Sequence, residues 1–205
     1  MSNFNCSQVI SCKSMFNGCI LLKKINLGKL DFPLCKNFKC MFNRCFNLEN
    51  LDVSHFNTKN STNFEKMFCE CKKLKNIDVS KFNSSKCEFI NSMFEYCENL
   101  SEVNMINWDM SNFHYSSNLD KFFQGLVPKI SETIIDSIYH LFYGCKNLKL
   151  IKMSSNFPNI KKLYFKAGNE IFKDLPPGGS FYWKKGVNCD KLLSHLPVSW
   201  NRVME

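Results

Sequence analysis

The sequence contains one phrase, Met-Phe-x-x-Cys, that recurs at a fixed interval of 26 residues. Its four copies end at Cys19, Cys45, Cys71 and Cys97, and a divergent fifth copy, Leu-Phe-x-x-Cys, ends at Cys145. A fixed period between 20 and 50 residues indicates a stacked architecture, in which each unit buries its apolar face against the next. The repeat therefore predicts an elongated solenoid and not an ordinary globular domain.

Each repeat combines two apolar patterns. Four residues of the clearest copy follow the i, i+3, i+4, i+7 spacing of a short helix: Phe38, Met41, Phe42 and Cys45. Leu51 and Val53 then alternate around Asp52, which is typical of a short strand with one buried face. A helix of about ten residues and a lone short strand are both marginal in water, so each unit requires its neighbours.

The repeat pattern divides the chain into two regions. Residues 1–165 are predicted to form the solenoid, with an irregular coil near residues 109–137, where the period breaks and Pro128 disfavours regular strand pairing. Residues 166–205 follow the point where the pattern fades. We expect them to cap the end of the stack, because terminal repeats need an atypical cap.

The Phe and Cys of each motif are predicted to line the core. These positions are Phe16, Cys19, Phe42, Cys45, Phe68, Cys71, Phe94, Cys97, Phe142 and Cys145. Buried cysteine behaves as a small hydrophobe, so we expect free thiols here. Zinc sites use converging pairs such as Cys-x-x-Cys, so this linear column predicts no metal site. The close spacing of other cysteines leaves occasional disulfides open.

A row of polar residues occupies the centre of each predicted strand: Asn26, Asp52, Asp78, Asn104 and Lys152. By alternation these side chains are expected to face solvent. One interpretation is a strip that contacts a ligand, because solenoids present extended binding surfaces. The other is a solvated row with local turns, such as Asp52 to Ser54. A third interpretation is that a cation binds between Asp52 and Asp78.

Composition and motifs narrow the function classes. The formal charge of +9 favours acidic partners or nucleic acid. The lysines hold no single repeat slot, however, and the aromatic residues fall in core slots, so no nucleic-acid groove is predicted. No stretch reaches the roughly 18 apolar residues of a membrane span. Only Cys189 and His195, both in the predicted cap, suggest a nucleophilic pair.

The segment Met41 to Thr58 reads Met-Phe-x-x-Cys-x-x-Leu-x-x-Leu-Asp-Val-Ser-x-Phe-Asn-Thr. It resembles the repeat of the BspA-like leucine-rich repeat surface proteins, which include mycoplasma-type lipoprotein repeats. The resemblance covers about residues 10–165. It implies an α/β repeat solenoid, a right-handed, leucine-rich-repeat-like stack of short parallel strands and short helices. Each coil would take about 26 residues, within the range of such repeats, and the stack would have about five to six coils. The resemblance carries over no catalytic residue.

The expected function is a non-catalytic protein–protein interaction module, which the resemblance places among surface proteins in adhesion or host interaction. An intracellular repeat scaffold or effector-like regulator is the alternative. The lack of a visible export signal near Met1 and the many apparently free thiols favour it. A cysteine-dependent enzyme using Cys189 is the third hypothesis. We expect a monomer that binds a protein partner and holds no cofactor.

Overall fold

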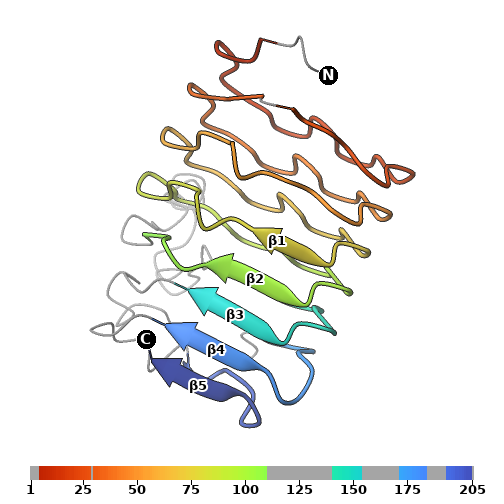
Figure 1. The fold of residues 1–205 in the computed structure, drawn as a ribbon, viewed down its shortest axis with the longest axis vertical. Coiled ribbons are helices and arrows are strands. Elements are labelled where there is room, and N and C mark those ends of the chain that lie inside the picture. The colour runs from red at the N-terminus through yellow and green to blue at the C-terminus, as the bar shows by residue number, and fades with distance from the viewer. Residues whose placement is uncertain (1–4, 29, 110–139, 154–170, 184–192, 205) are drawn as a thin grey trace, which may run out of the picture.

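The structure is a computed structural model that describes residues 5–28, 30–109, 140–153, 171–183 and 193–204. These residues wind through successive coils, with the earliest coil at one end of the stack and the latest at the other (Figure 1). The irregular coil predicted near 109–137 lies outside the described residues apart from Asp109, and so does Cys189.

Five short parallel strands form one sheet in chain order (Figure 1). They are β1 (Asn76–Asp78), β2 (Glu102–Met105), β3 (Leu150–Met153), β4 (Ser180–Trp183) and β5 (Asn201–Met204). The strands pair in register, so that Ile77 lies beside Val103 and Val103 beside Ile151. All three side chains are buried, and the predicted parallel arrangement with one buried face is confirmed.

The sheet continues beyond β1 towards the N-terminus. Lys24 and Asn50 form a parallel bridge, and the Lys75 N–H donates to the Glu49 carbonyl at 3.3 Å, which joins that pair to β1. With the five strands, the described sheet has seven levels, two plus five. This exceeds the predicted five to six coils, because β4 and β5 lie within residues 166–205 and extend the sheet there.

The predicted helices are wrong, since the described residues contain no helix element. The motif segments run instead as successive four-residue turns. The Met41 N–H donates to the Phe38 carbonyl at 3.1 Å, and the Cys45 N–H to the Phe42 carbonyl at 3.2 Å. The third residue of each of these turns has a positive φ, 58° at Cys40 and 60° at Arg44.

The same two positions have a positive φ in every described repeat. Before the Met or Leu of the motif these residues are Ser14, Cys40, Lys66, Ser92 and His140; before its Cys they are Gly18, Arg44, Glu70, Tyr96 and Gly144. The left-handed conformation is favourable for glycine and costs about 1 kcal/mol or more for other residues. Stacking must therefore offset a recurring local cost.

Hydrogen bonds between coils account for the turns. The N–H groups of Phe38, Cys40, Phe42 and Arg44 donate to carbonyls of Asn63, Glu65, Met67 and Cys69 in the next coil, at 2.8 to 2.9 Å. An α-helix would use those N–H groups within its own segment. We call this set of bonds, repeated from coil to coil, the turn ladder. The apolar spacing correctly predicted a buried face. It did not predict the direction of the backbone N–H groups, which is what distinguishes these turns from a helix.

Phenylalanines at equivalent repeat positions pack as a column through the core. Phe16, Phe42, Phe68, Phe94, Phe142 and Phe172 follow one another with ring centroids 5.3 to 6.1 Å apart and nearly parallel planes. Offset parallel stacking is a favourable aromatic geometry. The column accounts for six of the 20 phenylalanines of the chain, because each coil supplies a ring that covers the last.

The turn conformation can be tested at Lys66, which is exposed and has φ 55°. In a left-handed turn, Lys66→Gly should be more stable than Lys66→Ala by about 1 kcal/mol. In a helix the order would be reversed by a similar amount. Urea denaturation of the two variants measures the difference in the free energy of unfolding, and a more stable alanine variant would contradict the turn.

Candidate binding surface

The polar row predicted at the strand centres is present on the outward side of the sheet. Asn26, Asp52 and Asp78 are exposed, and Asn104 and Lys152 are partly exposed. Within the strands, Asp78 lies beside Asn104 and Asn104 beside Lys152. Asp78, Asn104 and Lys152 thus form one line across three neighbouring levels of the stack, and Asn26 and Asp52 hold the equivalent repeat positions in the two levels before them.

Most of these side chains are occupied in local turns. The Asp52 carboxylate accepts a hydrogen bond from the Ser54 N–H at 2.9 Å, and Asp78 accepts one from the Ser80 N–H at 2.8 Å. Asn26 and Asn104 accept from the N–H two residues on in the same way. The Ser54 N–H also holds the pKa of Asp52 below its usual range. The local-turn interpretation therefore describes four of the five residues.

The C-terminal part of the outward row has a different character. Lys152, Tyr182 and Val203 are in register on β3, β4 and β5, and the Lys152 Nζ lies 5.7 Å from the centroid of the Tyr182 ring. Leu150 also faces outward, at the start of β3. We call Leu150, Lys152, Tyr182 and Val203 the Tyr182 patch; all four are partly exposed.

Sequence reasoning missed Tyr182 and Val203 because both fall in the segment predicted to be a cap. Their spacing also departs from the repeat, since the interval from Lys152 to Tyr182 is longer than one period and the interval from Tyr182 to Val203 is shorter. A local signal was available in Ser-Phe-Tyr-Trp, directly after Gly179. Its second residue, Phe181, is buried as in the earlier strands.

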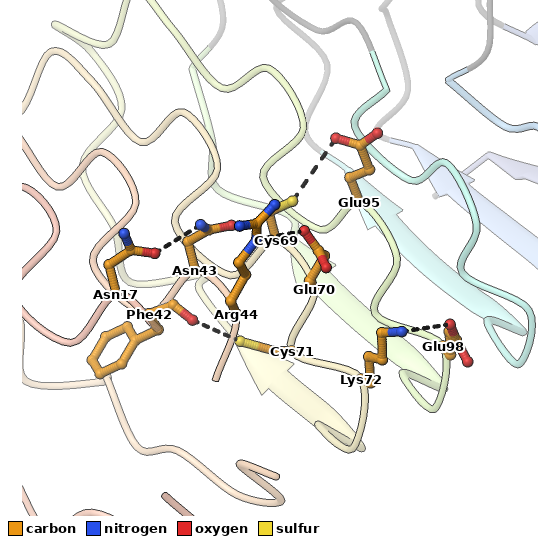
Figure 2. A network of polar contacts seen from close by, with 10 residues as sticks. All are labelled: Asn17, Phe42, Asn43, Arg44, Cys69, Glu70, Cys71, Lys72, Glu95 and Glu98. Carbon is orange, nitrogen blue, oxygen red and sulfur yellow. Dashed lines mark hydrogen bonds and ion pairs between the residues drawn. The ribbon is translucent and has the colours of Figure 1, made fainter. Parts of the chain in front are cut away.

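The repeated cysteines form a hydrogen-bonded column inside the stack. The Cys71 thiol donates to the Phe42 carbonyl of the preceding coil at 3.1 Å (Figure 2). Equivalent bonds of 3.0 to 3.1 Å join Cys45 to Phe16, Cys97 to Phe68 and Cys145 to Phe94. These four thiols are buried, whereas Cys19 is exposed and Phe16 only half-buried, because their coil is the outermost one described.

Burial keeps these thiols protonated and therefore unreactive. It raises the pKa of Cys45 to about 12 and the pKa values of Cys71 and Cys97 well above the ordinary value. The thiolate is the nucleophile and the metal ligand, so a neutral buried thiol serves neither purpose at pH 7. Within the described part of the chain, no group of three His, Cys, Asp or Glu side chains is placed to hold a metal ion.

Polar side chains of the turn segments also pair one repeat apart. Arg44 contacts Glu70 at 3.0 Å, and Lys72 contacts Glu98 at 3.6 Å (Figure 2). Lys39 pairs with Glu65 at 2.7 Å in the same sense, with the cation in the earlier coil. Such exposed pairs contribute about 0–1 kcal/mol each. Their regular direction favours the correct register of neighbouring coils.

One cluster combines a cysteine, a carboxylate and a histidine. The Glu95 carboxylate lies 2.9 Å from His140 Nδ1 and accepts a hydrogen bond from the Cys69 thiol at 3.8 Å. Burial and then the Glu95 charge raise the pKa of Cys69 to about 12. A nucleophilic cysteine needs a base within reach and a lowered pKa. The pKa of Cys69 is raised instead, so this cluster does not activate the thiol. His195, the other histidine singled out in the sequence, is exposed.

The in-register strands, the turn ladder and the Phe and Cys columns define a parallel-stranded repeat solenoid. The family model described as "Mycoplasma protein of unknown function, DUF285" matches residues 10–129, more than half of the 205 residues, and the chain belongs to that family. Neither the comparison with curated proteins nor that with solved structures gives a match. No helix among the described residues has the length and apolarity to cross a membrane.

The thiol column can be tested by comparing one slot at two depths. Cys71→Ser is expected to lower the free energy of unfolding by about 1–3 kcal/mol, because it places a more polar group in a fully buried site. Cys19→Ser is the matched control, since that residue has the same repeat position but is exposed. It should stay within about 0.5 kcal/mol of the wild type. Equal losses at the two positions in urea denaturation would contradict the column.

The buried thiols also predict a pH dependence of stability. The unfolded chain releases thiol protons near pH 8.5, whereas folded Cys71 and Cys97 retain them. The contribution of each thiol to the free energy of unfolding is therefore fully present below pH 8.5. It is lost as the pH rises towards the folded pKa, by up to about 1.4 kcal/mol per pH unit for each thiol. In urea titrations between pH 8.5 and 10.5, Cys71→Ala should show a shallower decline by about that amount. An unchanged slope counts against the buried thiol.

Proposed function

We propose that this chain is a non-catalytic repeat module that binds a protein partner through the outward face of its sheet. The observation that supports this most is the Tyr182 patch. Tyrosine is enriched among the residues that dominate binding energy at protein interfaces. Here Tyr182 stands between Lys152 and Val203, so an aromatic ring, a cation and an aliphatic side chain are adjacent on one surface.

The backbone beneath the patch is well supported. β4 pairs with β3 on one side and with β5 on the other, and Phe181, the neighbour of Tyr182, is fully buried. A side chain held on such a surface loses little conformational freedom on binding, which favours affinity. The N-terminal half of the row, with its oxygens occupied in turns, supplies a polar flank.

The more specific role that we propose is adhesion or host-protein binding at a cell surface. It is supported by the resemblance of Met41 to Thr58 to the BspA-like repeat, whose members include surface proteins. In that setting, the variable outward residues would contact the partner and the repeated core would serve only to place them.

A second candidate, an intracellular repeat scaffold or effector-like regulator, is supported by the thiols. The eleven described cysteines are free, and four of them donate the inter-coil bonds described above. Free thiols persist in reducing compartments. Thiol titration of denatured, unreduced protein from its native source distinguishes the two: twelve reactive thiols support the scaffold, and mostly oxidised cysteines support the surface protein.

The binding proposal predicts that Tyr182→Ser weakens partner binding by about tenfold or more, since a truncated anchor residue typically costs over 1 kcal/mol. Chemical crosslinking to immobilised chain, followed by mass spectrometry, identifies the bound protein, and calorimetry measures its affinity. Lys59→Ser, an exposed change in a turn outside the sheet, is the control and should bind as the wild type does. A partner that binds equally to Tyr182→Ser, or no saturable partner at all, contradicts the proposal.

A further inference from the structure

The large exposed apolar side chains of the described residues lie at the two ends of the stack. Five belong to the N-terminal coils: Ile10, Met15, Ile20, Leu21 and Leu34. The other two, Val198 and Met204, are in the last level. Leu21 is 81% exposed and Val198 94% exposed. Apolar surface concentrated in this way marks an interaction surface more often than scattered residues do.

The N-terminal end has the features of an interior coil, and no coil precedes it among the described residues. In the inner coils, the carbonyls of Met41 and Asn43 accept hydrogen bonds from the coil before them. Met15 and Asn17 hold the equivalent positions in the first coil, and no N–H of the described residues donates to their carbonyls. Cys19 likewise has the slot of the buried thiols but is exposed.

The part of the sheet that the structure describes is open at the same two ends. Lys23 accepts a hydrogen bond through its carbonyl from the Glu49 N–H, towards the second coil. In a parallel ladder, the backbone groups of the next residue, Lys24, point to the opposite side, away from the stack. At the other end, β5 is last in the strand order and pairs only with β4 within the described sheet. Edge strands of this kind are templates for pairing with another chain.

We propose that copies of this chain associate head to tail, with the free edge of β5 pairing in parallel with residues 22–26 of a second copy. All strands of the stack run in one direction, so this contact continues the existing ladder. It would also bring Val198 and Met204 of one copy towards Ile20 and Leu21 of the next. Because the two contacting surfaces differ, the association is open-ended and gives short filaments.

Charge and polarity disfavour the alternative contact between two N-terminal ends. Residues 5–28 contain Lys13, Lys23 and Lys24 and no acidic residue, so two such ends repel. They would also oppose carbonyls to carbonyls along the turn ladder. The C-terminal level, residues 193–204, contains one fixed charge, Arg202, whose guanidinium donates to the carbonyls of Leu193, Leu196 and Trp200.

Such a filament would repeat the Tyr182 patch along one surface. The patch lies on the outward face of the sheet, whereas the proposed contact uses the sheet edge, so association leaves the patch accessible. Repeated display raises avidity without any new contact. The association itself does not depend on the proposed function and can be tested without a partner.

Sedimentation velocity over a wide range of concentration tests the proposal. The average mass of the wild type should rise with concentration past that of a dimer, and added salt should strengthen the association by screening the lysines and Arg202. Leu21→Glu blocks the N-terminal end and Val198→Glu the C-terminal end. Each variant alone should remain monomeric, while their equimolar mixture should form a dimer that does not grow, because one intact end of each kind remains.

The outward-face variant Asn76→Glu is the control and should associate as the wild type does. Two results would overturn the proposal. One is a wild type that stays monomeric at every concentration, as expected from the sequence. The other is a Val198→Glu variant that dimerises alone while Leu21→Glu does not, which would indicate contact between N-terminal ends. Both variants change highly exposed side chains, and circular dichroism checks that they fold.

Discussion

The structure depends on hydrogen bonds from every second N–H group of the Met-Phe-x-x-Cys segment to a carbonyl in the next coil. Two left-handed residues per repeat turn those N–H groups out of their own segment and towards the neighbour. This sets neighbouring coils in register, which stacks Phe42 on Phe68 and places the Cys71 thiol against the Phe42 carbonyl. No coil is stable alone, because each supplies bonding partners for the next.

The period and the strand alternation were sufficient to predict a parallel stack, and Ile77, Val103 and Ile151 lie in register as expected. The helices could not be excluded in the same way. An i, i+3, i+4, i+7 pattern states which side chains are buried and leaves the direction of the backbone N–H groups open. The one hint in the sequence was the glycine at Gly18 and Gly144, because glycine readily adopts the left-handed conformation. The other repeats have larger residues at this position, so the hint is not repeated there.

The candidate surface was predicted in part for a similar reason. Alternation placed Asp52 and Asp78 correctly on the outward face, but whether their oxygens were free depended on the local turn. Tyr182 was missed because β4 and β5 follow at intervals that differ from the repeat and from each other, so strict periodicity could not find them. In β4, Phe181 keeps the buried position although the spacing changes, and the proposed binding surface lies in that less regular part of the stack.

The turn ladder is tested most directly by scalar coupling across hydrogen bonds, measured by NMR on isotope-labelled protein. The coupling reports which carbonyl carbon accepts from a given amide nitrogen. The account predicts a signal between the Arg44 amide and the Cys69 carbonyl, one coil away. A signal between the Arg44 amide and the Cys40 carbonyl, four residues earlier, would show a helix and contradict it.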